Sequence, residues 1–380
     1  MSKIVSLLIT VCALFAVLAS AGCIAVNPSE NTGDTLTITD AAGRVAEILA
    51  NSHNIAVTGA GSSRLIAYLE AVDQLSATDF YDNENKQERA TDIRPYAIAY
   101  DELYTMQNVG SAGGSADAET ILKIAPDYIL YATGTTPQDS VAAADELQEK
   151  TGIPVILFVS TDPVMNEELF AENLRMLGTI LGKEERAEEL LSAIDEIKLD
   201  LKERAAKSTA EEKSIYVGGV AWKGSHGFDW TAPTYLPYIF LDISNPAAGA
   251  SNAGGAQIAK EQIIAWNPDV LLVDLATLIA AGGGSIYELS TDPSYNAMDA
   301  VQDGNVYAVL PYTSMGTNVE TALVDAYYLG TILYPDTFAD IDLAEKTNEI
   351  FTLFVGENVF DHLNANVEGL AFTKLTISTL

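Results

Sequence analysis

The segment 222–230 concentrates side chains suited to ligand contact. It reads Trp-Lys-Gly-Ser-His-Gly-Phe-Asp-Trp and directly follows a predicted strand. The ring of Trp222 could grip a planar or bulky molecule. Contacts to the oxygens of that molecule, or to an open coordination position of its metal, could come from Lys223, Ser225 and His226. An isolated histidine is more often structural, so a direct bond from His226 to a metal is the weaker interpretation.

A second candidate is Arg64, which follows the glycine-rich turn 59–61 at the start of a predicted helix. Free backbone N–H groups and the helix dipole favour an anion at such a position, and a guanidinium strengthens that preference. Ser62 and Ser63 could cap the helix or contact the same anion. The alternative is that Arg64 pairs with a surface carboxylate, and the sequence leaves both interpretations open.

Polar and aromatic side chains also gather at 94–100, a stretch without the periodicity of a core-facing element. Tyrosine offers a flat surface and a phenol, and loops commonly carry binding residues. We therefore expect ligand contacts from Arg94, Tyr96 and Tyr100. Further candidates are residues with hydroxyl groups that follow predicted strands in the two halves of the chain: Thr133, Thr135 and Tyr312.

Enzymatic interpretations have little support. Ser225, His226 and Asp229 have the residue types of a catalytic triad, but they share one short loop, whereas a triad is usually drawn from separate elements. The turn 59–61 lacks the third glycine of a dinucleotide fingerprint, and no Walker-type loop occurs in the sequence. The three histidines are scattered, so we expect no dedicated zinc site, no cofactor and no catalytic residues.

The candidates are distributed over two similar halves of the chain. One predicted helix runs into Ala-Pro-Asp-Tyr-Ile-Leu-Tyr at 125–131, and another runs into Asn-Pro-Asp-Val-Leu-Leu-Val at 267–273. Between them lies 183–207, which has no Gly or Pro and places its apolar residues on one helical face. We predict two Rossmann-like α/β lobes with parallel sheets, joined by a single long α-helix. The ligand cleft should lie between the lobes.

The domain boundaries follow from this arrangement. We assign 36–165 to an N-terminal α/β lobe, 166–208 to linking helices and 209–380 to a C-terminal α/β lobe. Two helices with regularly spaced apolar residues are predicted at 317–333 and 343–355, and we expect both to cover the second sheet.

Residues 1–23 have the layout of a secretory signal peptide, with Lys3, an apolar run over 4–19, and Ser-Ala-Gly before Cys23. Small residues before a cysteine resemble a lipoprotein box, which predicts lipidation of Cys23. The alternatives are an ordinary cleavage nearby or an uncleaved anchor. Residues 24–35 are typical of a short tether. We expect an extracytoplasmic protein anchored to the membrane through its lipid.

Overall charge narrows the range of partners. The chain of 380 residues has 20 Lys and Arg against 53 Asp and Glu, a net charge of −33. Such a surface repels nucleic-acid phosphates and anionic lipids, so we expect no nucleic-acid partner. An extracytoplasmic protein and a salt-adapted protein would both fit this charge.

In the order of its motifs the chain resembles the substrate-binding proteins of ABC importers for iron-siderophore complexes, haem and cobalamin, the group with a rigid helical linker. The resemblance covers nearly all of the chain after the signal peptide. It rests on Asp-Ala-Ala-Gly-Arg at 40–44, Gly110, Asp-Ala-Glu-Thr-Ile-Leu at 117–122, Ala-Pro-Asp at 125–127, Thr-Gly-Ile-Pro-Val at 151–155, Glu-Gln-Ile-Ile at 261–264, Trp-Asn-Pro-Asp at 266–269, Ala-Val at 300–301 and Gly-Asn-Val-Tyr at 304–307. Residues 64–66, 94–97 and 224–227 also resemble the branch of this family that binds iron complexes.

This resemblance implies a binding protein that captures a metal chelate, first of all an iron complex, in the cleft. The chelate would be delivered to an ABC permease with its cytoplasmic ATPase, and the binding protein would be a monomer. Four alternatives stay open: a corrinoid or haem cargo, a molybdate or tungstate oxyanion held by Arg64, an extracytoplasmic enzyme, and a structural surface protein.

One departure from these relatives concerns docking onto the permease. In many of them, the helix after the first strand carries a glutamate thought to dock on the permease, and Arg64 occupies that place here. We expect Glu70 in the first lobe and Glu320 in the second lobe to provide the docking contacts instead.

Overall fold

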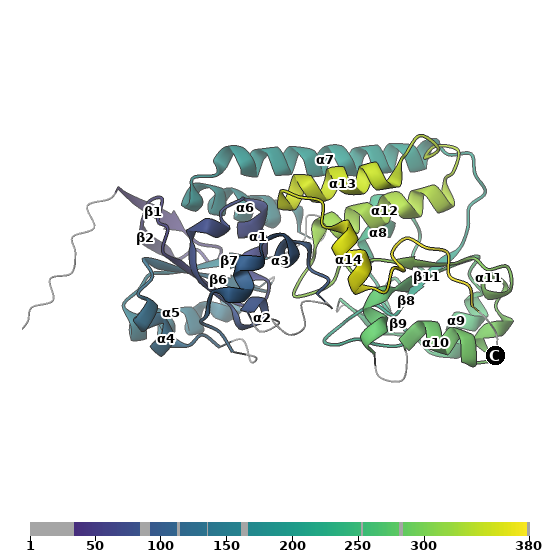
Figure 1. The fold of residues 1–380 in the computed structure, drawn as a ribbon, viewed down its shortest axis with the longest axis horizontal. Helices are drawn as coiled ribbons and strands as arrows, with labels where there is room; N and C mark the ends of the chain where they lie inside the picture. The colour runs from purple at the N-terminus through teal and green to yellow at the C-terminus, as the bar shows by residue number, and fades with distance from the viewer. Residues whose placement is uncertain are drawn as a thin grey trace, which may run out of the picture. The chain divides into compact units, whose positions relative to one another are not determined.

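The computed structural model describes residues 34–83, 92–111, 115–134, 136–160, 166–251, 254–280 and 284–377 (Figure 1). The predicted signal peptide with Cys23, most of the tether, and Thr135 lie outside these residues. The described chain opens with an antiparallel hairpin of β1 (Thr35–Thr39) and β2 (Val45–Leu49). No helix among the described residues is long and apolar enough to cross a membrane.

The first lobe is built on a parallel sheet with the strand order β5-β4-β3-β6-β7. All residues of its strands β3 and β7 are buried, as expected for a parallel sheet covered on both faces. The strands are β3 (Ile55–Thr58), β4 (Leu75–Thr78), β5 (Gln107–Asn108), β6 (Tyr128–Thr133) and β7 (Val155–Val159). The helices are α1 (Ser62–Tyr68), α2 (Phe80–Asn83), α3 (Pro95–Ala99), α4 (Ala118–Ile124), α5 (Val141–Thr151) and α6 (Glu167–Leu181).

The second lobe is built on a smaller parallel sheet with the order β12-β11-β8, beside a short antiparallel pair of β9 and β10. Its strands are β8 (Ile215–Gly218), β9 (Trp230–Thr231), β10 (Ala256–Gln257), β11 (Val270–Asp274) and β12 (Val306–Val309). Its helices are α8 (Leu236–Phe240), α9 (Lys260–Trp266), α10 (Gly284–Thr291), α11 (Asp299–Gln302), α12 (Val319–Leu333) and α14 (Phe360–Asn366). The predicted pair of parallel α/β lobes is therefore confirmed.

The internal repeat has a local structural cause. Helix α4 is capped by Ala125 and helix α9 by Asn267, and both cap residues have left-handed backbones, with φ of 50° and 42°. Each is followed by a proline, which cannot continue a helix. The chain then enters β6 or β11, so the same capping signal turns it into the sheet of each lobe.

Helix α7 (Glu184–Lys207) is the predicted link between the lobes. Its buried residues lie on one face and are Ala187, Leu190, Ile194, Ile197 and Leu201. Acidic residues in its first turn and basic residues in its last turn complement the helix dipole. The helix packs on α6 of the first lobe and contacts α8 and α12 of the second (Figure 1). At ~1.5 Å per residue its 24 residues extend over about 36 Å.

Helix α13 (Leu343–Val355) was assigned wrongly to the second sheet. It packs on α12, but it also reaches α1 and α3 of the first lobe. The ring of Phe354 meets the ring of Tyr68 edge-on, with centroids 5.1 Å apart. The sequence pattern identified an apolar face but could not say which lobe that face covers. The lobes are therefore bridged by α13 as well as by α7.

Candidate functional site

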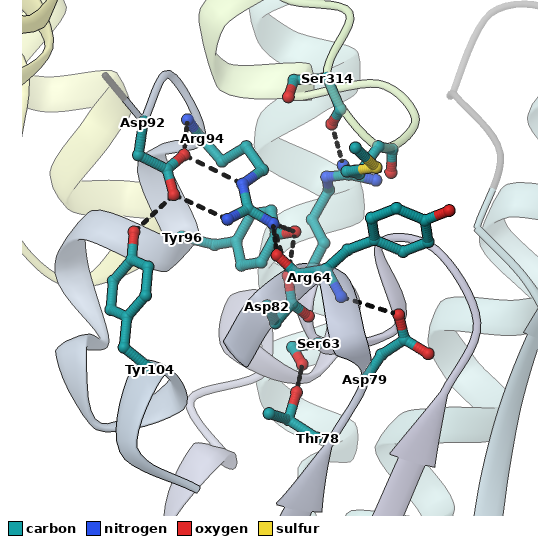
Figure 2. A network of polar contacts seen from close by, with 12 residues as sticks. Ser63, Arg64, Thr78, Asp79, Asp82, Asp92, Arg94, Tyr96, Tyr104 and Ser314 are labelled. Carbon is teal, nitrogen blue, oxygen red and sulfur yellow. Dashed lines mark hydrogen bonds and ion pairs between the residues drawn. The ribbon is translucent and has the colours of Figure 1, made fainter. Parts of the chain in front are cut away.

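Arg64 lies where the two lobes meet. Its side chain is 1% exposed, and its guanidinium reaches from α1 into the loop between β12 and α12. Nη2 donates to the carbonyl oxygens of Ser314 at 2.8 Å and Met315 at 2.7 Å. Nε donates to Oδ1 of Asn318 at 3.1 Å, and Nη1 donates to Oγ of Ser160, directly after β7, at 3.3 Å. Figure 2 shows Arg64 extended toward Ser314. Carboxyl ends of strands from both lobes therefore converge on one buried cation.

Two glycines allow the chain to come this close to Arg64. Gly61, with φ of +68°, lies directly against the carbonyl of Met315, where a Cβ atom would clash with the oxygen. Gly316 has φ of +102°, and a Cβ there would lie 2.7 Å from Nη1 of Arg64. Both positions therefore require glycine, because their φ values are unfavourable for other residues and because a Cβ atom would clash.

The acceptors of Arg64 within the described residues are neutral oxygens. A buried cation is usually compensated by a carboxylate or another anion. The face of the Tyr96 ring provides a weaker substitute, with the guanidinium carbon 5.1 Å from the ring centroid. The site is therefore electrostatically suited to an added negative charge.

Arg94 and Tyr96, which we predict to contact the ligand, already have polar partners inside the first lobe. Both are buried, and Arg94 forms ion pairs of 2.7 Å with Asp82 and with Asp92. The phenol of Tyr96 donates to Asp82 at 2.8 Å (Figure 2). Although burial opposes it, the charge and hydrogen bonds of Arg94 hold the pKa of Asp92 below its ordinary value. These residues form a buried network beside Arg64, in which one oxygen of Asp82 has no partner among the described residues.

The other first-lobe candidates differ in their surroundings. Ser63 is buried and its hydroxyl is 2.9 Å from that of Thr78, whereas the buried Ser62 has no partner for Oγ among the described residues. Thr133 places its hydroxyl 2.9 Å from that of Ser140. Tyr100 is half-buried, and burial raises the pKa of its phenol to about 12. Ser62 therefore has a buried hydroxyl without a described partner, two positions before Arg64 in the chain.

The segment 222–230 makes contacts within itself and with other parts of the second lobe. His226 stacks on Trp230, with ring centroids 3.9 Å apart, and its Nε2 is 2.7 Å from the carbonyl oxygen of Trp222. Because a carbonyl can only accept, Nε2 carries the proton there and is not free to bind a metal. Trp222 is half-buried against Gly254 and Gly255, where any Cβ would meet the indole.

The exposed residues of this segment are Lys223 and the glycine that follows it. The amino group of Lys223 lies 5.8 Å from the centroid of the Trp222 ring, and its backbone φ of 54° is left-handed. Ser225 is half-buried. Within the described residues, no hydrogen bond or ring contact joins this segment to Arg64. The two groups of candidate residues therefore do not contact each other in this structure.

Tyr312, another predicted ligand contact, is buried and holds residues of the second lobe in place. It is 4% exposed, its phenol accepts a hydrogen bond from the backbone N–H of Leu236 at 3.3 Å, and its ring lies 5.5 Å from that of Tyr235. Its carbonyl oxygen accepts from the backbone and the side chain of Asn318, at 2.8 and 3.2 Å. Tyr312 thereby helps to hold the Asn318 side chain whose oxygen meets Arg64.

Sequence reasoning missed several residues of this junction. Ser160 and Asn318 contact Arg64, and Tyr68 contacts the first residue of α12; none of the three was a candidate. Tyr68 could have been found, because a residue four positions after Arg64 shares its helical face. The partners in the second lobe had no such signal, since they are about 250 positions away.

A separate cavity of about 630 Å³ opens at the other end of the second sheet. It lies beside the first residues of β8 and β11 and is walled by Trp266 and Tyr334. Because ligands of α/β sheets bind at the carboxyl ends of strands, this position is not where the cargo site is expected.

A model of the family described as periplasmic binding protein matches residues 55–313, from the first residue of β3 to the residue before Ser314. That span is more than half of the chain. The chain belongs to this family.

Individual relatives are more distant. A lipoprotein of Bacillus subtilis, an uncharacterized ABC transporter substrate-binding protein named YvrC, is 22% identical over 63% of this chain and 71% of its own length. The molybdate-binding protein MolA of Haemophilus influenzae is 22% identical over 66% of this chain and 73% of its own. The structure of MolA with molybdate aligns with a TM-score of 0.63 and 18% identity, covering 85% of this chain and 98% of MolA. The structure of a periplasmic solute-binding protein of Veillonella parvula aligns with a TM-score of 0.64 and 20% identity, covering 88% of this chain and 97% of that protein.

Membership establishes the general role. The chain is an extracytoplasmic solute-binding protein of an ABC importer, and the family consists of transport proteins and not of enzymes. The structural likeness, at 18 to 20% identity, shows the shared fold of two α/β lobes.

The two residues expected to dock on the permease differ sharply in exposure. Glu320 is 0% exposed, so its carboxyl group does not lie on the surface in this conformation. One of its carboxyl oxygens accepts from the phenol of Tyr68, and the other has no partner among the described residues. Glu70 is half exposed at its side chain and lies 3.6 Å from Arg186, so it stays a prediction.

Proposed function

We propose that this binding protein carries an anionic metal chelate, with a ferric complex as the first candidate, and delivers it to its ABC permease. The observation that supports this is the buried Arg64, whose acceptors are neutral oxygens contributed by both lobes. A guanidinium is always charged and presents a planar fork that matches a carboxylate or a similar anion. An anion would therefore gain more from Arg64 than the present carbonyl partners do.

The segment 222–230, called the aromatic segment below, supplies the second part of the proposed site. Trp222 and Lys223 would cover the apolar or π-rich part of a chelate, with Ser225 and His226 adding hydrogen bonds. Ser62, whose buried hydroxyl has no described partner, would donate to the anion beside Arg64. Because the two parts are not in contact in this conformation, a ligand large enough to bridge them would be favoured over a small ion.

A tetrahedral oxyanion such as molybdate or tungstate is the second candidate. It is favoured by the hydroxyl groups next to the cation, since Ser160 already contacts Nη1 of Arg64 at 3.3 Å. The similarity to MolA points in the same direction. An oxyanion would contact Arg64, Ser62 and Ser160 and would not contact Trp222. A corrinoid or haem would instead depend mainly on the aromatic segment.

Cys23 would be lipidated and residues 24–35 would tether a monomeric body to the membrane, with 36–165 and 209–380 as the two lobes and 166–208 linking them. Support for the anchor comes from the signal-like N-terminus and from the lipoprotein relative. Glu70 is the proposed docking residue, because its carboxylate is exposed.

A ligand screen by thermal shift and calorimetry tests this function. The panel contains ferric citrate, ferric siderophores, haem, cobalamin, molybdate and tungstate, and a ligand at 100 times its Kd adds about 2.7 kcal/mol to stability. We expect Arg64→Gln to lose binding and Arg64→Lys to keep part of it. Arg175→Gln, which removes an exposed arginine paired with Glu188, is the matched control. Undiminished affinity in Arg64→Gln would contradict the proposal.

A further inference from the structure

Helices α1 and α12 form a buried polar seam between the lobes. Arg64 and Tyr68 lie one helical turn apart in α1, and both reach the start of α12. Arg64 donates to Asn318 at 3.1 Å, and the phenol of Tyr68 accepts from the backbone N–H of Val319 at 3.2 Å. The same phenol donates to the carboxyl group of Glu320. Cargo binding at Arg64 would therefore take place beside a buried acid.

The seam holds opposite charges that do not pair. Arg64 and Glu320 are 1% and 0% exposed, yet the acceptors of Arg64 are neutral oxygens and one oxygen of Glu320 has no described partner. Burial raises the pKa of Glu320 to about 7, while its bond from Tyr68 and the charge of Arg64 act in the opposite direction. Within the described chain, Tyr68 and Arg64 are the titratable side chains that shift the pKa of Glu320. Neither belongs to α7, α8 or α13, the helices that pack against α12.

We propose that Glu320 determines the charge selectivity of the cargo site, so that an anion held by Arg64 is bound together with a proton taken up by Glu320. This rests on the proposed function, in which Arg64 receives an anion. An anion beside Arg64 offsets the positive potential that favours ionised Glu320, so the carboxylate accepts a proton from solvent. Linkage is reciprocal, so protonation of Glu320 strengthens anion binding by the same factor.

With neutral Glu320 the seam carries the single positive charge of Arg64 and suits an anion. With ionised Glu320 the two charges cancel, and an anion gains less from binding. Tyr68 is the positioning residue, because its bond to the carboxyl group favours the ionised form.

The test is calorimetric titration of the full protein with molybdate and with ferric citrate from about pH 6 to about pH 8.5. Repeating it in two buffers with different ionisation enthalpies counts the protons taken up. We expect the affinity of the native protein to fall by up to about tenfold per pH unit above neutrality, with uptake of up to one proton. Glu320→Gln should bind with little pH dependence. Tyr68→Phe should keep the dependence but move it to higher pH.

The matched control is Asp325→Asn, which removes another fully buried carboxylate of α12 without a contact to Arg64. It should retain the native pH dependence. Binding that is independent of pH in the native protein, or equally dependent in Glu320→Gln, overturns the role of Glu320 and leaves the proposed cargo site standing. If the probes and the rest of the ligand panel fail to bind, the cargo site itself is refuted, and the proton linkage is refuted with it.

Discussion

Nη2 of Arg64 donates a hydrogen bond to the carbonyl oxygen of Met315, 2.7 Å away and 251 positions later in the chain. Gly61 on one side and Gly316 on the other leave room for this bond. A cation of the first lobe is thereby held by the backbone of the second.

Gly316→Ala should weaken both the fold and cargo binding. A Cβ at this position would lie 2.7 Å from Nη1 of Arg64, and the backbone φ of +102° is unfavourable for alanine. Gly249→Ala is the control, because it has φ of +78° but no atom within 4 Å of the added Cβ. We expect about 1 kcal/mol of destabilisation in the control from backbone strain and a larger loss in Gly316→Ala. Denaturant unfolding gives both values, and equal losses would show that Arg64 tolerates the methyl group.

Arg94→Met should destabilise the protein strongly and leave the cargo site chemically intact. It removes the partner of the buried Asp82 and Asp92, and breaking a buried ion pair in this way costs about 3–5 kcal/mol. Arg175→Met removes an exposed pair with Glu188 and should cost at most about 1 kcal/mol. Thermal unfolding compares the two variants. A small loss for Arg94→Met would show that water or a rearranged side chain satisfies the two carboxylates.

Asp325→Asn should change how stability depends on pH. Burial raises the pKa of Asp325 well above its ordinary value, and burial raises that of nearby Asp274 to about 8. The folded protein then keeps protons that the unfolded chain releases near pH 4, so stability falls as pH rises from about 4 to about 8. One such proton corresponds to about 1.4 kcal/mol per pH unit. Asp325→Asn should therefore gain stability relative to the native protein at pH 8, measured by urea unfolding. A constant difference across this range would contradict the assignment.

Trp222→Ala should weaken binding of a chelate by more than about 1 kcal/mol. Some stability should also be lost, because the indole packs against Gly254 and Gly255. Trp266→Ala is the matched control, since Trp266 is also half-buried but lines the distant cavity of the second lobe. Calorimetry at a temperature where all variants are folded separates the two effects. Unchanged affinity in Trp222→Ala would remove the aromatic segment from the site and favour a small oxyanion.

Much of the architecture could be predicted, because it depends on neighbours in sequence. The repeat at 125–131 and 267–273 follows from a left-handed cap, a proline and a buried strand, which are all local features. The linking helix α7 follows from apolar residues at helical spacing. The prominence of Arg64 also follows from local features, since it stands after a glycine-rich turn at the start of a helix.

The sequence alone determined two α/β lobes, their link and the candidate cation. Only the tertiary structure decided what surrounds that cation. Whether Arg94 faces ligand or two buried carboxylates, and whether Glu320 faces a permease or Tyr68, depends on chain segments up to 252 positions apart. Side-chain periodicity reports burial along one element and carries no information about the partner across an interface. The charge environment of the site is therefore a property of how the two lobes pack.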